Sequence, residues 1–184
     1  SNNNALTAGD IGYKYVLKVL TDAGRSDVIF DMNNRSDVPG YGYQIAAGAT
    51  ALTESWQALP SVSNNHFMLG HIMEWFYEGL AGIGQLPGST AYKHIRIQPK
   101  VVGNITSAAA SYQSMYGTII SAWNKTSTHF VLDLTIPVNT DAEIILPVTA
   151  SMHIFQNGIL KNPVIVNGNA IVHVGSGIYK FEVK

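Results

Sequence analysis

One acidic residue stands apart from every basic residue in the sequence. Glu54 lies in the stretch "GATALTESW", residues 48–56, and no lysine or arginine occurs between residues 36 and 92. An isolated carboxylate must reach water, accept hydrogen bonds from buried donors or serve a functional site. Trp56 follows two residues later, and an acid beside an aromatic ring suits a sugar site, where the ring stacks and the acid activates water. A capping or surface role for Glu54 remains the alternative.

A second group of polar residues lies in "HFMLGHIMEWFYEGLAG", residues 66–82. His66, Gly70, Glu74 and Tyr77 follow one another at i, i+4, i+8 and i+11, the spacing of one face of an α-helix. For Glu74 and Tyr77 we favour structural hydrogen bonds. His66 stands at the expected helix start, where free backbone donors can face a cavity. A structural role and a functional role for His66 are both open.

Composition excludes several kinds of chemistry. The chain has no cysteine, so disulfides, thiol catalysis and Cys-based zinc sites are ruled out. Its histidines lack metal-ligand spacing, and neither a G-x-S-x-G motif nor a phosphate-binding loop occurs. We therefore expect no metal and no cofactor. A net charge of −1 gives no reason to expect nucleic acid or an anionic membrane as partner.

The sequence does not assign a compartment. No apolar run has the length of a membrane span, and "SNNNALTAGD" at the start lacks the basic and apolar regions of a signal peptide. We expect no membrane insertion. Periplasmic, secreted and cytoplasmic locations all stay open.

The first part of the chain, up to about residue 83, has helical periodicity. The pattern predicts helices over residues 9–24, 25–34, 44–57 and 66–80, with Ser26 as a possible N-cap of the second. Gly48 and β-branched Thr50 and Thr53 weaken the third. The fourth, of about four turns, is apolar around most of its circumference, which is typical of a helix buried on several sides.

After "IGQLPGST" the hydrophobic period changes to two. Short alternating runs are separated by turn signals such as "QNG" and "VNGNA", and this cadence is typical of an antiparallel β-sandwich. The strand candidates are "KHIRIQP", "TSAAASYQSM", "GTIISAWN", "HFVLDLTIP", "AEIILPV", "HIFQNG", "AIVHVGSG" and "IYKFEVK". We therefore predict helices over residues 1–83, a linker over 84–92 and a β-sandwich domain over 93–184.

An ordered series of motifs over residues 7–148 resembles the C-terminal part of bacterial α-L-rhamnosidases of glycoside hydrolase family 78. The motifs are "GATALTESW", "NNHFMLGHIMEWFYEGLAGI", "YKHIRIQP", "ASYQSMYGTIISAW" and "LTIPVNTDAEIILP". The resemblance implies an α + β multi-domain protein, in which residues 1–83 are the last helices of an (α/α)6 catalytic barrel and an antiparallel β-sandwich follows.

The resemblance also implies roles for single residues. Glu54 matches the family's general base, which polarises the water that attacks the anomeric carbon with inversion. His66 matches a contact to a sugar hydroxyl, Trp56 is expected to contact the substrate, and Glu74 is better treated as structural. Thr53 and Ser55 stand where the family has other residues, and the loop after Trp56 is short, which bears on substrate specificity. We find no candidate for the general acid in residues 1–53.

These implications leave three functions to separate. The first is the C-terminal part of an inverting α-L-rhamnosidase that acts on rhamnose-containing glycosides or polysaccharides. The second is a non-catalytic carbohydrate-binding or scaffolding relative, and the third is an (α/α)6 glycosidase with another sugar preference. We expect this chain by itself to be inactive, because the general acid is missing. We also expect it to self-associate through exposed barrel helices around Phe67, Ile72, Trp75 and Phe76.

Overall fold

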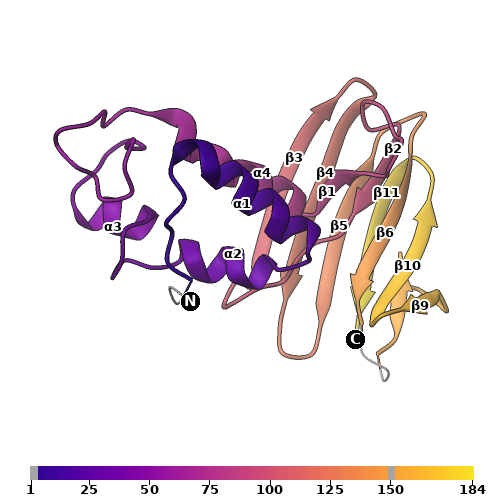
Figure 1. Cartoon of the computed structure of the whole chain (residues 1–184). Helices are drawn as coiled ribbons and strands as arrows, with labels where there is room; N and C mark the ends of the chain where they lie inside the picture. Colours follow the sequence, from indigo (N-terminus) through magenta and orange to yellow (C-terminus); the bar gives the residue numbers. More distant parts are fainter. Residues whose placement is uncertain (1–3, 149–151) are drawn as a thin grey trace. The chain divides into compact units, whose positions relative to one another are not determined.

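The structure is a computed structural model that describes residues 4–148 and 152–184. The chain forms two compact units, Ser1–Trp75 and Phe76–Lys184. We call them the helical unit and the β unit (Figure 1). Helices followed by a largely antiparallel β-sandwich confirm the predicted fold class. The further division into barrel helices, a linker and a sandwich domain at residues 83 and 92 stays a prediction.

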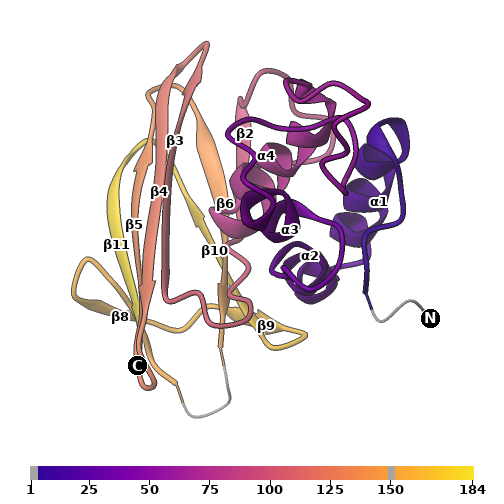
Figure 2. The same ribbon diagram turned by 90° about the vertical axis from the view of Figure 1, so that its left-hand side faces the viewer.

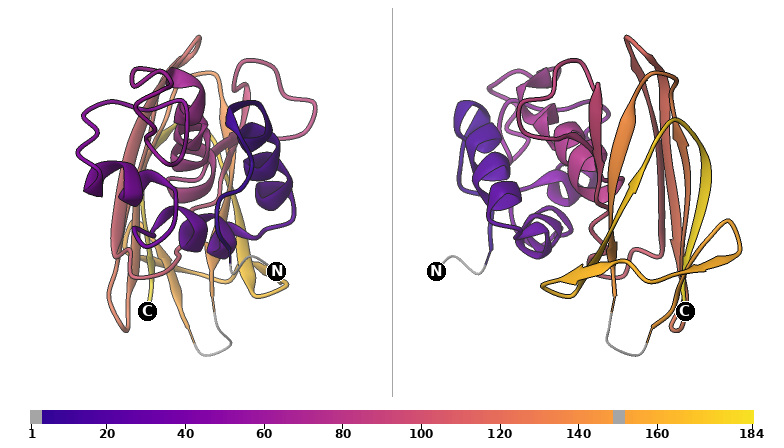
Figure 3. Two further views of the ribbon diagram at one scale, coloured as in Figure 1. Left: turned by 60° about the vertical axis from the view of Figure 1, so that its left-hand side comes forward. Right: turned by 90° about the vertical axis from the view of Figure 1, so that its right-hand side faces the viewer.

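The helical unit contains α1 (Asp10–Asp22), α2 (Ser26–Asn33), α3 (Tyr41–Ala46), the 3₁₀ helix η1 (Phe67–His71) and α4 (Ile72–Trp75). The first helix packs against α2, η1 and α4, as Figure 3 shows. Tyr13 and Leu17 bury one face of α1, since positions i and i+4 share a face. This packing holds the N-terminal end of α1 next to the segment that precedes η1.

Two details of the predicted helices are wrong. Ser26 is the first residue of α2 and not its N-cap, a position that Arg25 takes without a side-chain hydrogen bond. The hydroxyl oxygen of Ser26 instead accepts the indole N–H of Trp75, at 3.0 Å. The helix predicted over residues 44–57 begins earlier and ends at Ala46. Gly48, with a φ of +86°, takes the chain out of the helical region.

The segment predicted as one four-turn α-helix changes its winding twice. It runs through η1, α4 and a π-helical turn, η2 (Phe76–Leu80). Because a 3₁₀ helix has three residues per turn, His66 and Gly70 do not share the face that a regular α-helix would give them. The predicted polar seam is therefore wrong at its start.

The apolar circumference of this segment is also only partly buried. Ile72 and Trp75 are 7% and 3% exposed, whereas Phe67 is 83% exposed. Of the four residues expected to form an exposed patch, Ile72 and Trp75 are thus already buried, and that part of the expectation is wrong. Phe67 and, at 40%, Phe76 are exposed as expected.

The β unit is a sandwich of two sheets (Figure 2). The five-stranded sheet has the order β1-β2-β6-β10-β9, and the six-stranded sheet has the order β3-β4-β5-β11-β7-β8. All pairs are antiparallel except β2 with β6. The bounds are β1 Ile83–Gln85, β2 His94–Ile97, β3 Ser107–Ser114, β4 Gly117–Lys125, β5 Phe130–Ile136, β6 Asp141–Pro147, β7 Ile154–Gln156, β8 Ile159–Lys161, β9 Val164–Val166, β10 Asn169–Val174 and β11 Gly177–Val183.

Alternation explains why these segments become strands. In β5 the residues Phe130, Leu132, Leu134 and Ile136 are buried while those between them are more exposed, the pattern of a strand with one face on a core. The eight strand candidates of the sequence all form strands. Three short strands, β1, β8 and β9, were not among the candidates; each has three residues, as does β7, which was predicted within "HIFQNG".

The turn from η2 into β1 depends on one glycine. Gly82 has a φ of +79°, and a Cβ there would lie 2.3 Å from the backbone nitrogen of Pro99. Its carbonyl accepts the N–H of Gln98 at 2.9 Å. No residue with a side chain could replace it without moving the backbone that leads from η2 into β1.

Candidate functional site

Glu54 and His66 lie in the long irregular segment between α3 and η1. Two backbone hydrogen bonds close this segment into a loop: Glu54 donates to the carbonyl of Ser63, and His66 donates to the carbonyl of Leu52, each at 2.8 Å. The two predicted site residues are therefore fixed at the base of one loop. A loop held by backbone bonds of this kind can position side chains without regular secondary structure.

The Glu54 carboxylate is exposed and is anchored through one of its oxygens. Its Oε2 accepts the backbone N–H of Ser63 at 3.0 Å. Within residues 4–148 and 152–184, Oε1 has no hydrogen-bond donor and no base forms an ion pair with Glu54. The sequence left three options for this residue. The structure rules out burial, and it leaves a carboxylate with one oxygen anchored and the other free to hold water.

This carboxylate borders a cavity in the helical unit. The cavity has a volume of about 610 Å³. It is lined by residues from the N-terminal segment, the start of α1, the turn before α3 and the Glu54 loop, namely Ala5, Leu6, Thr7, Gly9, Asp10, Val38, Pro39, Glu54, Ser55, Trp56, Gln57 and Val62. A concave, mostly apolar site with a few polar groups is the usual form of a small-molecule site.

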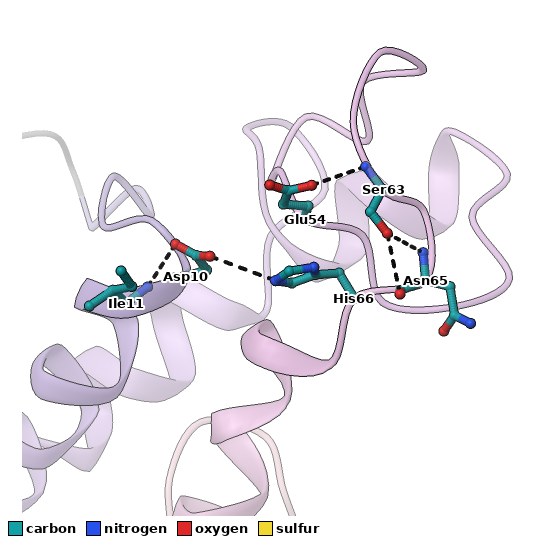
Figure 4. A network of polar contacts seen from close by, with 6 residues as sticks. All are labelled: Asp10, Ile11, Glu54, Ser63, Asn65 and His66. Atoms are coloured by element: carbon teal, nitrogen blue, oxygen red, sulfur yellow. Dashed lines mark hydrogen bonds and ion pairs between the residues drawn. The ribbon is translucent and has the colours of Figure 1, made fainter.

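A second carboxylate, Asp10, lines the same cavity. It begins α1, and its Oδ1 accepts the backbone N–H of Ile11 at 2.8 Å. Its Oδ2 lies 3.7 Å from Nε2 of His66 (Figure 4). Sequence reasoning missed Asp10, because an acid in the first turn of a helix is ordinary there. Only the packing of α1 beside the loop brings it to Glu54 and His66.

Trp56 lines the cavity, but its ring is almost fully buried. The side chain is 5% exposed, and its indole N–H donates to the carbonyl of Ala8 at 2.7 Å. The rings of Tyr13 and Tyr41 meet it edge-on, with centroids 4.9 and 5.1 Å away. A substrate contact of Trp56 stays a prediction, and this packing favours a role in supporting the cavity wall.

Burial is the main cause of the raised pKa values of Tyr13 and Tyr41. It raises the pKa of Tyr41 to about 12. It also raises the pKa of Tyr13, and the neighbouring Tyr41 raises it further. The hydroxyl of Tyr13 donates to Oδ1 of Asn33 at 2.6 Å, and that of Tyr41 donates to the carbonyl of Leu69. Both rings therefore act as neutral, hydrogen-bonded supports behind Trp56.

The other polar candidates do not join this site. Glu74 is exposed on α4, and no hydrogen bond of its side chain is present among the described residues. A stabilising role for Glu74 through such a bond thus lacks support within this chain. No group of three acidic or histidine side chains in the described ranges could hold a metal ion. Among the same residues, none of the helices has the length and hydropathy that spanning a membrane requires.

Two family models match consecutive parts of the chain. Residues 1–80 match the bacterial alpha-L-rhamnosidase 6 hairpin glycosidase domain, and residues 82–158 match the bacterial alpha-L-rhamnosidase C-terminal domain. An alpha-L-rhamnosidase of Streptomyces avermitilis is 32% identical over 97% of this chain. One from an Alteromonas species is 31% identical over 99% of it.

Solved structures agree with these matches. The structure of alpha-L-rhamnosidase from Dictyoglumus thermophilum has a TM-score of 0.92 and 28% identity over the whole chain. The Streptomyces avermitilis enzyme, solved in complex with L-rhamnose, has a TM-score of 0.86 and 32% identity over 98%. The chain covers 21% and 18% of these two proteins, so it spans about a fifth of the relatives that it matches. It belongs to the bacterial α-L-rhamnosidase family, whose C-terminal part it matches.

Proposed function

We propose that the complete protein containing this chain is an inverting α-L-rhamnosidase in which Glu54 is the general base. The observation that carries the proposal is the free Oε1 of Glu54 at the cavity, with the other oxygen anchored by Ser63. Such a carboxylate can hold a water molecule and take its proton as the water attacks the anomeric carbon. Family membership supports rhamnosides as the substrate class.

Inversion also needs a proton for the departing oxygen. The general acid must face the base across the glycosidic bond, with about 6.5–9.5 Å between the carboxyl groups to leave room for water. Asp10 is poorly suited to this role, because its Oδ1 accepts the backbone N–H of Ile11 and its Oδ2 faces His66. We therefore assign the general acid to a part of the protein outside this chain. His66 would contact a hydroxyl of the bound sugar.

The test uses the product of the complete open reading frame. Glu54→Gln keeps the size and the acceptor for Ser63 but cannot take a proton, so kcat should fall by about 10²–10⁴-fold with little change in KM. Glu74→Gln is the matched control, because Glu74 is an exposed glutamate of the same unit, and it should leave kcat unchanged. The 184-residue chain alone should show no turnover.

Azide gives a second, stereochemical readout. In Glu54→Gly, a small anion can replace the activated water and attack the anomeric carbon, and inversion then gives a β-rhamnosyl azide. Near wild-type kcat in Glu54→Gln, with activity lost in Glu74→Gln, would exchange the roles of the two glutamates. A complete protein that binds rhamnose without hydrolysing rhamnosides would instead identify a non-catalytic carbohydrate-binding relative. Hydrolysis of other glycosides only would identify a glycosidase with another sugar preference.

A further inference from the structure

One nitrogen of His66 is buried without a hydrogen bond. Nε2 is closed off from solvent and has no hydrogen-bond partner among the described residues. Its nearest charged neighbour is Oδ2 of Asp10, at 3.7 Å. Since an unmade hydrogen bond of a buried polar atom costs free energy, an arrangement of this kind calls for a reason.

Asp10 is held where it can act on this nitrogen. The backbone N–H of Ile11 holds Oδ1 at 2.8 Å, and the start of a helix favours a negative charge. This anchoring turns Oδ2 toward the imidazole, as Figure 4 shows. The Asp10 side chain is 34% exposed and lines the cavity that Glu54 also borders.

We propose that Asp10 is a positioning residue that fixes the ring orientation and the tautomer of His66 for sugar binding. With Oδ2 as its acceptor, the proton of the neutral imidazole sits on Nε2, and Nδ1 becomes an acceptor. Nδ1 makes no hydrogen bond within the described parts of the chain and is not among the buried atoms there that lack a partner, so it can accept a hydrogen bond from a sugar hydroxyl. This role of Asp10 rests on the proposed function, in which His66 contacts the sugar.

Oδ2 of Asp10 and Nε2 of His66 are close enough for a small shift to bring them into a hydrogen bond. A contact of 3.7 Å is longer than a hydrogen bond, whose usual range ends at about 3.2 Å. Hydrogen bonds in unliganded sites are often long and tighten when substrate binds. His66 adjoins the cavity through Asp10, which lines it. A sugar hydroxyl that donates to Nδ1 makes Nε2–H a stronger donor, and this favours a shorter distance between Nε2 and Oδ2.

A double-mutant cycle in the complete protein tests whether Asp10 acts through His66. Asp10→Asn should raise KM about tenfold, the effect of losing one well-placed hydrogen bond, with kcat changed much less. In a His66→Ala background the same change should have almost no effect on KM, because its target is gone. Asp22→Asn is the matched control, since Asp22 ends the same helix in an exposed pair with Lys18, and it should leave KM unchanged.

A second variant separates positioning from helix stability. Asp10→Ser keeps a side-chain oxygen near the backbone N–H of Ile11 but is too short to reach His66. It gives up the negative charge at the start of α1, so it should melt slightly below the wild type and raise KM as Asp10→Asn does. Equal KM changes in the wild-type and His66→Ala backgrounds would overturn the proposal. So would an Asp10→Ser variant with wild-type KM.

Nitrogen-15 NMR of the imidazole gives a readout that needs no activity. In the wild type His66 should show its proton on Nε2 with Nδ1 unprotonated, and in Asp10→Asn this single tautomer should give way to a mixture. The complete protein could hydrolyse no rhamnoside while the tautomer of His66 still depended on Asp10. That result would reject the proposed function but support the pairing of Asp10 with His66. If the protein were active and the tautomer did not respond to Asp10→Asn, the pairing would be wrong.

Discussion

The two units bury their apolar residues in different ways. In the β unit the core is mostly aliphatic, with Ile144, Leu132 and Phe181 all 0% exposed, and its buried Trp123 donates its indole N–H to the carbonyl of Leu80. In the helical unit several of the largest buried side chains carry a polar group that needs a partner. Trp75 uses Ser26, and Trp56 uses the carbonyl of Ala8. A core of this kind depends on hydrogen-bond geometry as well as on packing.

The two units also differ in where their exposed apolar residues lie. On α1, Ile11, Tyr15 and Val19 are 69%, 64% and 66% exposed, and their spacing of four residues puts them on one helix face. In the β unit, exposed apolar residues are spread over a turn, an edge strand and a central strand, as in Met115, Ile159 and Ile178. The helical unit thus combines an unpaired apolar face with an irregular loop and an open cavity. The comparison teaches that the apolar core cluster lies in the β unit and the candidate chemistry in the helical unit.

The largest expected effect tests the core of the β unit. Phe181→Ala removes a side chain that is 0% exposed and should destabilise the unit by about 3–5 kcal/mol. Ile178→Ala, three residues earlier on the same strand and 79% exposed, should cost less than about 0.5 kcal/mol. Hydrogen exchange of the β5 and β11 amides in denaturant measures both. Similar losses in the two variants would remove the distinction between the core and the outer face.

Alkaline pH should weaken the helical unit more than the β unit. Burial raises the pKa of both Tyr13 and Tyr41, the latter to about 12, so between about pH 10 and 12 the folded unit keeps protons that the unfolded chain loses. Because the folded state then binds more protons, its stability falls as pH rises through this window. In the β unit burial raises the pKa of Tyr92 to about 12, a single half-buried group.

Amide exchange at pH 8 and at pH 11 can follow the two units separately. Exchange from α1 and α2 should speed up more than exchange from β5 and β11. Tyr41→Phe removes one of the two buried phenols, so it should reduce the pH dependence in the helical unit while leaving that of the β unit as it was. An undiminished pH dependence in Tyr41→Phe would show that these phenols do not cause it.

The fold of the β unit could be predicted because its signal is local. Alternation in "HFVLDLTIP" and "AEIILPV" determines which face is buried, and the turn residues between such runs separate the strands. What the sequence did not reveal is pairing between distant strands, such as parallel β2 and β6. Alternation over three residues is a weak signal, and β8 was missed although β7, of the same length, was predicted.

The helical unit was harder for a physical reason. In residues 44–57 helix propensity competes with Gly48 at a positive φ, and the conformation after Ala46 is set by tertiary contacts. The candidates Glu54 and His66 could be named from motifs. Their proximity to Asp10 could not, because it arises from the packing of α1 beside a loop more than forty positions away.

A single substitution to lysine on α1 should have the smallest effect on folding, and it tests the exposed helix face most directly. If Ile11, Tyr15 and Val19 form a face that needs covering, the 184-residue chain should associate with itself, and its mass by light scattering should rise with concentration. Tyr15→Lys places a charge in the middle of this face at an exposed helical position. It should change the free energy of unfolding by no more than about 0.5 kcal/mol but shift the chain toward monomer. Met115→Lys, which charges a turn residue of the β unit that is 89% exposed, serves as the control and should leave association unchanged. A wild-type chain that stays monomeric at high concentration, or a Met115→Lys variant that dissociates as readily as Tyr15→Lys, would show that the face on α1 does not drive assembly.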